Sequence, residues 1–231
     1  MSLLLLLPST ILWGCEAEER EVAAEVDVFP QAATEVTFAS LEALGSHRLD
    51  ARIQTTTRIE GVPPTETVET TSLRWRDADH WQVSRRRDGV PMNEVLAWEG
   101  HAWTSTGGAA LADRGDAEPY RADLSVGWDP WRRALGTAAE KLAFRPVGTE
   151  SIEGRAARLY AVEPAQPDGG KGRRIERVVG RVWIDELTSV RLVGDVTLAT
   201  EHRGRAQEVR LSFSVAGIGE DPGVSPPPGA P

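Results

Sequence analysis

Histidine and cysteine are the side chains of this chain best suited to metal binding or nucleophilic catalysis. The four histidines, His47, His80, His101 and His202, do not have the spacing of zinc ligands, and Cys15 is the single cysteine. The sequence also lacks a GxSxG elbow, an HExxH helix and a phosphate-binding P-loop. Carboxylates distant in sequence remain open as a source of chemistry. The residues therefore predict no enzyme, no catalytic residue, no metal site and no cofactor.

Cys15 lies where an apolar segment gives way to an acidic one. Residues 1–15 read MSLLLLLPSTILWGC, and EAEEREVAAEVD follows. The run Leu3–Leu7 is too short for a permanent membrane-spanning helix. The end of the segment, LWGC, resembles the bacterial lipobox, in which the cysteine is diacylated and becomes the first residue of the mature protein. Two features depart from that pattern, because Trp13 replaces a small residue and the segment has no basic n-region.

The lipobox resemblance implies a lipoprotein signal peptide over residues 1–14, with Cys15 as the lipid anchor. Residues 15–35 then form a lipidated, acidic and flexible tether to the membrane. By analogy with enteric bacteria, Glu16 favours the outer membrane, with the protein facing the periplasm. Two alternatives stay open, namely an ordinary hydrophobic N-terminus with a buried cysteine and a short helix over residues 16–35.

Composition limits the class of partner. The net charge of −9 argues against nucleic acid, which requires a basic surface, and disfavours electrostatic docking onto anionic lipid. With 231 residues and 40% hydrophobic content, the chain is expected to form one full-sized domain over residues 36–217. Residues 218–231 are expected to form a disordered tail rich in proline and glycine. Eight tryptophans, against two tyrosines and four phenylalanines, supply most of the aromatic surface.

Alternating strands account for most of the domain. In His47–Glu60 the apolar residues alternate with polar ones, which indicates a long, half-buried strand. Short β-rich runs between Gly148 and Thr200 are bounded by turn residues. The pattern predicts an α+β, mainly β fold built on a strongly curved antiparallel sheet. Further strands are expected over Thr65–Arg76, His80–Arg87 and Ala206–Val215, and turns at Glu153-Gly154, Gln166–Gly172 and Asp185–Ser189.

The register of one hairpin can be predicted from its apolar residues. A five-residue loop over Asp185–Ser189 would give one continuous apolar face, whereas a four-residue loop would place Val182 against Arg191. A slip of one residue moves every side chain to the other face, so the five-residue loop is preferred. The expected pairs are Ile184 with Val190, Val182 with Leu192, and Val178 with Val196.

A second hairpin, NEVLAWEGHAWTST, carries two tryptophans. With a two-residue turn at Glu99-Gly100, Trp98 opposes His101 and Leu96 opposes Trp103, so that all four lie on one face. Two interpretations are open. The face is either an aromatic core cluster or the wall of an apolar ligand cavity.

Two helical segments are predicted. Phe38–Ser46 has helical apolar spacing and a stop at Gly45. Over residues 120–144 a broken helix is expected, with Asp129 as N-cap and Pro130 at the first position. Gly107–Pro119 is expected to be a loop. The apolar stripe of the second helix comprises Trp131, Leu135, Ala138, Ala139 and Leu142.

The segments GTESIEGRAARLYAVEP and GRVWIDELTSVR resemble the back half of the LolA-like outer-membrane lipoprotein-carrier family and of the mycobacterial LppX/LprG-like lipoproteins. By order of elements the resemblance covers residues 36–217. It implies a half-open antiparallel barrel that holds acyl chains and is closed at its mouth by helices, including the one near Trp131. The alternative is a helix packed permanently on the sheet.

Three functions follow as expectations. The first is a lipid-anchored envelope protein that binds a lipid or the acyl chain of a lipoprotein as carrier, receptor or sensor. The second is an interaction module resembling MucB/RseB, with an envelope protein as partner. The third is a structural surface lipoprotein with a filled core. The candidate ligand-cavity residues are Ile53, Trp75, Trp81, Leu96, Trp98, Trp103, Trp131, Ile184, Leu192 and Phe213.

Overall fold

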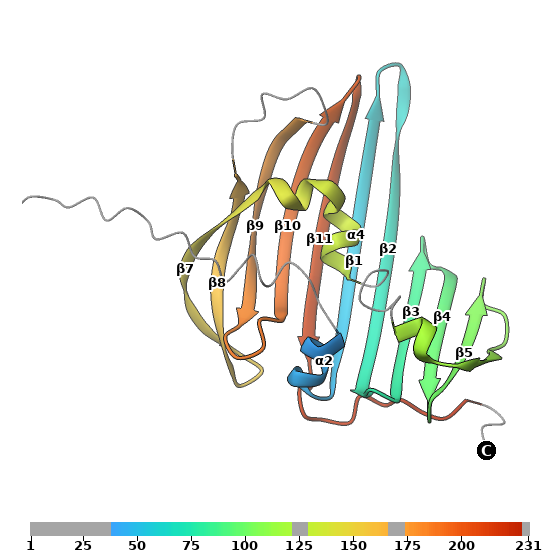
Figure 1. Cartoon of the computed structure of the whole chain (residues 1–231). Coiled ribbons are helices and arrows are strands. Elements are labelled where there is room, and N and C mark those ends of the chain that lie inside the picture. The colour runs from blue at the N-terminus through green and yellow to red at the C-terminus, as the bar shows by residue number, and fades with distance from the viewer. Residues whose placement is uncertain (1–37, 122–128, 166–173, 228–231) are drawn as a thin grey trace, which may run out of the picture.

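A computed structural model describes residues 38–121, 129–165 and 174–227. It consists of one antiparallel sheet of eleven strands with two short α-helices on one of its faces (Figure 1). The predicted lipid anchor Cys15, the acidic tether and the Gln166–Gly172 turn lie outside the described residues. The strands are β1 (His47–Ile59), β2 (Val62–Asp77), β3 (His80–Arg87), β4 (Val90–Trp98), β5 (His101–Thr106), β6 (Ala112–Asp116), β7 (Leu142–Ile152), β8 (Arg155–Pro164), β9 (Arg174–Asp185), β10 (Arg191–His202) and β11 (Arg205–Ala216), and the helices are α2 (Phe38–Leu44), α4 (Pro130–Leu135) and the 3₁₀-helix η1 (Gly136–Lys141).

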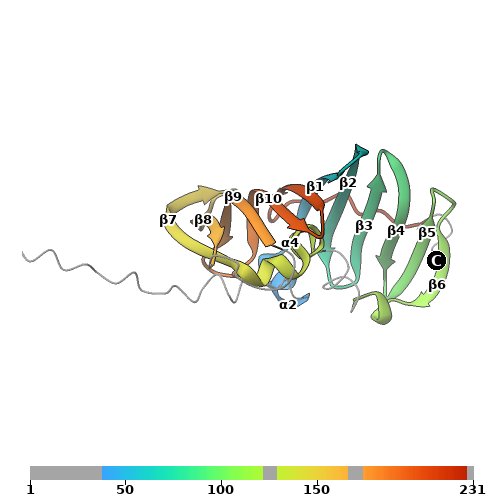
Figure 2. The same cartoon turned by 90° about the horizontal axis from the view of Figure 1, so that it is seen from above.

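The strand order is β6-β5-β4-β3-β2-β1-β11-β10-β9-β8-β7. The chain thus starts at the centre of the sheet, proceeds by hairpins to the β6 edge, crosses over α4 to the β7 edge, and returns by hairpins to the centre. Seen from above, the sheet curves around α2 and α4 (Figure 2). Its two edge strands do not pair, so the mainly β, half-open barrel predicted from sequence is confirmed.

Most hairpins form at the turns that the sequence predicts. At Glu99-Gly100 and Glu153-Gly154 both central residues have positive φ, between 48° and 80°, as a two-residue turn between twisted strands requires. Trp98 therefore pairs with His101, as expected. Gly107–Pro119 is not a continuous loop, since it contains β6.

The predicted register of the β9–β10 hairpin is wrong by one residue at Ile184 and by two residues beyond a bulge. Ile184 pairs with Arg191, and after a bulge near Leu192 the strand pairs Val182 with Gly194 and Val178 with Leu198. The bulge adds an unpaired residue that the loop length alone did not reveal. A shift of two residues keeps each side chain on its original face, so the apolar face that motivated the prediction is still continuous.

Gly194 marks the place where this part of the sheet accepts a large side chain. A Cβ atom at Gly194 would lie 2.3 Å from the ring of Phe213, on the neighbouring strand. The glycine therefore leaves space that the aromatic ring fills.

The end of the chain contradicts the expectation of disorder as far as residue 227. After β11, residues 217–227 cross the outer face of the sheet at the end of β1–β5 (Figures 1 and 2). Arg74 and Arg76 donate hydrogen bonds to the carbonyl oxygens of Gly223 and Val224, and Val224 is only 3% exposed. We call residues 217–227 the strap. The strap is held further by a hydrogen bond from the Gly219 N–H to the Ser46 carbonyl at 2.8 Å and by the Arg76–Asp221 ion pair at 3.0 Å.

Candidate functional site

The concave face of the sheet, which carries α2 and α4, is the candidate site. Seven of the predicted cavity residues lie in one apolar cluster on this face, and each is 7% exposed or less. The cluster joins strand side chains to those of α2 and α4. The seven are Ile53, Trp75, Trp81, Trp131, Ile184, Leu192 and Phe213.

The other three predicted cavity residues do not share this face. Leu96, Trp98 and Trp103 form a separate cluster with Leu111 and Val224 of the strap. On these strands the concave positions are held by small residues instead, as at Ala97 and Ala102. The pairing of Leu96 with Trp103 was predicted correctly, but the bulkier side of the hairpin faces outward and cannot line a cavity on the concave side.

Helix α4 is seated in the concave face through its apolar residues. Trp131 and Leu135 are 1% and 2% exposed. The Trp131 ring stacks on Phe144 at 5.9 Å, and the guanidinium of Arg191 lies 5.4 Å from the Trp131 ring centre. As predicted, Asp129 caps the helix by accepting a hydrogen bond from the Trp131 backbone N–H at 2.9 Å, with Pro130 at the first position.

A buried ion pair fixes the start of α4. The second carboxylate oxygen of Asp129 accepts a 2.5 Å hydrogen bond from Arg191 on β10, and the two side chains are only 2% and 3% exposed. A charge at this depth requires its partner, because an unpaired buried charge is strongly destabilising. The pair therefore ties α4 to the floor of the sheet.

Further along α4, Arg133 contacts a carboxylate that also binds two other arginines. Glu69 on β2 accepts hydrogen bonds from Arg133 at 2.5 Å, from Arg87 at 2.6 Å and from Arg85 at 3.4 Å. Burial opposes ionisation of Glu69, but the hydrogen bonds from Arg87 and Arg133 outweigh it, so the pKa of Glu69 is lowered from its ordinary value. We call Glu69, Arg85, Arg87 and Arg133 the arginine cluster.

Several buried polar atoms of the concave side have no hydrogen-bond partner among the described residues. They include the indole nitrogens of Trp81 and Trp131 and Nε2 of His47. Burial lowers the pKa of His47, which keeps its imidazole neutral, while its Nδ1 contacts the Gly45 carbonyl at 2.6 Å. Buried donors are nearly always satisfied in folded proteins, so these atoms mark places where a ligand or water would gain a hydrogen bond.

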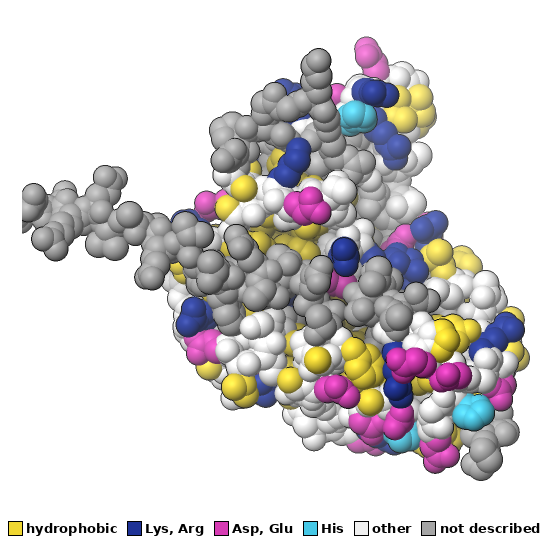
Figure 3. Space-filling view, viewed as in Figure 1, with side chains coloured by type: hydrophobic (Ala, Val, Ile, Leu, Met, Phe, Trp, Pro, Cys, Tyr) yellow, Lys and Arg dark blue, Asp and Glu magenta, His cyan; other side chains and the backbone are white. Residues whose placement is uncertain are grey.

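Helix α4 does not fill the concave face completely. Beside it lies a cavity of about 270 Å³ with a mixed lining. On the strands, its apolar part comprises Ile53, Leu198 and Val209, and its polar part comprises Thr55, Thr200, Gln207 and Glu69, to which α4 adds Arg133. Figure 3 shows hydrophobic side chains in the middle of this face with basic side chains next to them. The face thus combines an apolar floor, a small covering helix and residual space.

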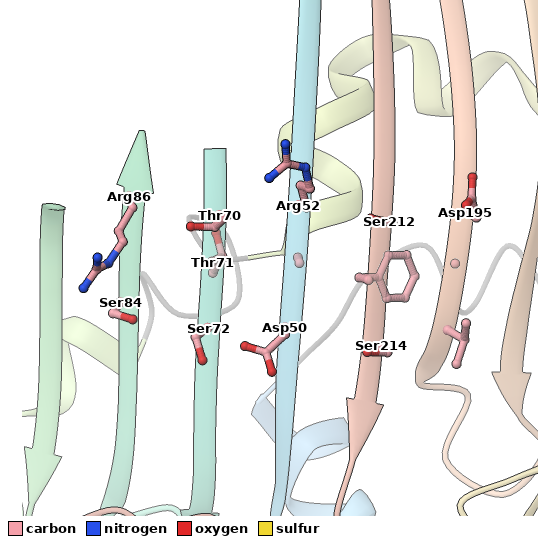
Figure 4. Close-up of a pocket in the computed structure, with 14 residues that line it drawn as sticks. Asp50, Arg52, Thr70, Thr71, Ser72, Ser84, Arg86, Asp195, Ser212 and Ser214 are labelled. Atoms are coloured by element: carbon pink, nitrogen blue, oxygen red, sulfur yellow. The ribbon is translucent and has the colours of Figure 1, made fainter. Parts of the chain in front are cut away.

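The outer face carries a shallow groove of about 580 Å³ across β3, β2, β1, β11 and β10 (Figure 4). Short hydroxyl side chains form its floor, and Arg52, Arg86, Asp50 and Asp195 stand among them. The sequence analysis did not single out this groove, because Ser and Thr at alternate strand positions indicate only a solvated face. The hydroxyl residues that face outward are Thr70, Ser72, Ser84, Ser212 and Ser214.

Two general searches of the described residues gave negative results. No three His, Cys, Asp or Glu side chains within residues 38–121, 129–165 and 174–227 are grouped so that they could hold a metal ion. In the same ranges, every helix is too short or too polar to cross a membrane.

No family model and no curated protein matches this sequence. Among solved structures, the chain is similar to a DUF1329 family protein from Desulfovibrio piger, with 13% identity over 84% of this chain and 94% of that one and a TM-score of 0.28. It is similar to a LolA superfamily protein from Nitrosomonas europaea, with 8% identity, 79% and 95% coverage and a TM-score of 0.23. It is also similar to a Pseudomonas aeruginosa MucA/MucB complex, with 16% identity over 78% of this chain but only 55% of that one and a TM-score of 0.28.

Two of these three neighbours carry the LolA and MucB names that the sequence resemblance had suggested. Their identities and TM-scores are too low to transfer a function. What the chain does must therefore be argued from its own residues.

Proposed function

We propose that this chain is a cell-envelope protein that binds an apolar ligand, a lipid or the acyl chain of a lipoprotein, on its concave face. It acts as a carrier, receptor or sensor and performs no chemistry on the ligand. One observation carries the proposal. The apolar floor of the sheet is covered by the six-residue helix α4 and by η1, with a cavity beside them, rather than by a second layer of sheet.

The energetic argument concerns exchange between α4 and a ligand. Each buried methylene contributes about 0.8 kcal/mol, so an acyl chain of ordinary length gains several kcal/mol on leaving water. Trp131 and Leu135 of α4 now cover the positions that such a chain would contact. Binding therefore requires α4 to shift, at the expense of the Asp129–Arg191 pair. The polar contacts of α4 determine how much free energy its displacement costs, whereas the apolar floor of the sheet supplies the affinity for the acyl chain.

The proposed location rests on the sequence. Cys15 would carry the lipid anchor, and residues 16–35 would form the tether. The domain would then lie in the cell envelope, and the favoured arrangement is anchoring in the outer membrane with the domain facing the periplasm. LolA-superfamily and MucB structures among the neighbours are compatible with an envelope role. An anchored protein suits a receptor or sensor better than a free shuttle.

The alternative is a protein-interaction module of MucB type, or a structural lipoprotein with a filled core. The observation in its favour is that Trp75, Trp81 and Trp131 are 0–1% exposed and packed in a single cluster. In that case α4 is a permanent part of the core. A neighbour solved as MucA/MucB shows that such a complex exists for that protein.

Native mass spectrometry with lipid extraction tests the proposal on the domain expressed in bacteria from residue 16 onward. We expect co-purifying lipid at up to one equivalent, and Leu135→Ala on α4 is expected to raise lipid uptake because it weakens the cover and enlarges the space beneath it. Trp103→Ala on the outer face is the matched control and should leave uptake unchanged. If the protein carries no lipid and does not bind added fatty acid or phospholipid, that result would instead favour a role as a protein-interaction module.

A further inference from the structure

A second pocket lies on the concave side, between α4 and the strands β3, β4 and β5. Its volume is about 570 Å³, and Arg85, Arg114 and Arg133 contribute to its wall. They come from β3, β6 and α4, which are far apart in sequence. The fold therefore gathers three guanidinium groups around one opening. The other described residues of the wall are Asn93, Glu94, Val95, Thr104, Ser105, Thr106 and Tyr120.

Arginines outnumber acids among the described residues of the pocket wall. Glu94 is the only acid among the described residues of the wall, and its carboxylate accepts a 2.6 Å hydrogen bond from Gln82, which pairs with outward-facing Leu96. Glu69 approaches from the side and is shared by Arg85, Arg87 and Arg133. Burial first, and then the nearby Arg133 guanidinium, lower the pKa of Arg85, as expected where positive charges crowd together.

The uncharged part of the wall offers further hydrogen-bonding groups. The side-chain oxygen of Asn93 is buried and has no partner among the described residues. An amide in this position presents either its oxygen or its NH₂ group to a ligand, since the two ends exchange by a simple flip. Thr104 already accepts a 2.9 Å hydrogen bond from Nε of Arg114, which directs that guanidinium along the wall. The hydroxyl of Thr106 lies on the same face of β5.

We propose that this pocket binds an oxyanion, a phosphate or a carboxylate, held by Arg85, Arg114 and Arg133 with Asn93 and the threonine hydroxyls as additional partners. Arginine suits this task because its planar group binds such oxygens through two parallel hydrogen bonds. The oxyanion is either a free ion or the headgroup of an anionic amphiphile. The proposal does not depend on acyl-chain binding, because the pocket is already open beside α4.

The negative net charge of the chain means that anions are not attracted to the protein in general, but only to the arginines of this pocket. With a net charge of −9, the protein as a whole repels anions, so binding requires close contact with the local arginines. Such binding weakens with salt less steeply than binding to an extended basic surface, because Arg85 and Arg133 are partly buried.

Isothermal titration of the full chain with inorganic phosphate and with lysophosphatidic acid tests the proposal. We expect at least one of the two to bind with one-to-one stoichiometry. Arg114→Gln is expected to weaken binding about tenfold, since a hydrogen bond between charged groups is lost. Arg114 is exposed and donates a hydrogen bond to the Thr104 hydroxyl, so the variant should fold normally. Equal affinity for both probes identifies the free ion as sufficient, whereas tighter binding of the lipid identifies a headgroup site.

The matched control is Arg86→Gln. Arg86 is next to Arg85 on β3 but lines the outer groove instead, so this variant removes the same charge from the opposite face. We expect less than a twofold change in affinity. Failure of both probes to bind at about 10 mM, or an equal loss in Arg86→Gln and Arg114→Gln, would overturn the proposal. Lipid extraction of the unmodified protein reports on the acyl-chain proposal separately.

Discussion

The two faces of the sheet bury tryptophan in different ways. On the concave face, Trp75, Trp81 and Trp131 are 0–1% exposed within a large cluster closed by α2 and α4. On the outer face, Trp98 and Trp103 belong to a small cluster that also contains Leu96, Leu111 and Val224 of the strap. The same residue type therefore holds the domain together on one face and attaches a peripheral segment on the other. The comparison shows that an aromatic pattern in a hairpin does not identify the face on which it lies.

The largest difference in stability between the two faces is expected when a single tryptophan is replaced by alanine. Trp75→Ala should lower the free energy of unfolding by about 3–5 kcal/mol, because it leaves a cavity in the main cluster. Trp98→Ala should cost much less, since Trp98 is only half-buried and its contacts are the edge of His80 and the Arg76 guanidinium. Urea unfolding followed by circular dichroism measures both. Similar losses for the two variants would show that the outer cluster is part of one common core.

Removing an ion pair should also destabilise the fold more on the concave face than on the outer face. Asp129→Asn leaves Arg191 buried without its counter-charge and is expected to destabilise the fold by about 3 kcal/mol. The comparison variant is Asp221→Asn, which removes the partner of Arg76 in the strap, where the aspartate side chain is 70% exposed. No measurable change in unfolding is expected there. A small effect of Asp129→Asn would mean that α4 is not held by the pair and opens more easily than proposed.

The arginine cluster links stability to pH. Because the pKa of Glu69 is lowered in the fold, its ionised form contributes stability above its unfolded pKa, near the ordinary value of 4.5. That contribution is lost as the pH falls through the lower folded pKa. Wild-type protein should therefore exceed Glu69→Gln by about 1–2 kcal/mol at pH 7, and the gap should shrink steadily below about pH 4.5. A gap that stays constant down to pH 3 would assign the effect to packing rather than to charge.

The sequence predicted where the strands and turns lie better than it predicted which face of the sheet each side chain occupies. Period-two alternation located β1 and β11, and Glu-Gly pairs located two tight turns, because these signals act over a few residues. The bulge near Leu192 was missed, since a bulge changes the pairing without changing the local pattern. Local patterns also say little about which face of a hairpin is inside when both are apolar, as in Val95–Trp98.

The arginines of the proposed oxyanion pocket, which the sequence analysis did not single out, are brought together by the topology of the sheet. Arg85, Arg114 and Arg133 are ordinary charged residues in their local contexts, and no spacing rule connects them. They meet because the chain leaves the β6 edge and crosses the concave face through α4 before it forms β7. In the same way, the contacts of the strap depend on arginines of β2, nearly 150 residues earlier in the chain.

The smallest expected effect concerns the strap itself. Val224 is buried in one cluster with Leu96 and Trp103, so Val224→Ala should lower the free energy of unfolding by about 1 kcal/mol. The control is Ser225→Ala, at a neighbouring exposed position, and it should leave the free energy of unfolding unchanged. Tryptophan fluorescence gives a second measurement, because loosening the strap admits water to Trp103 and shifts its emission to longer wavelength before global unfolding begins. A shift that coincides with global unfolding would show that strap and sheet unfold as one unit, and the two faces would then differ in depth of burial but not in cooperativity.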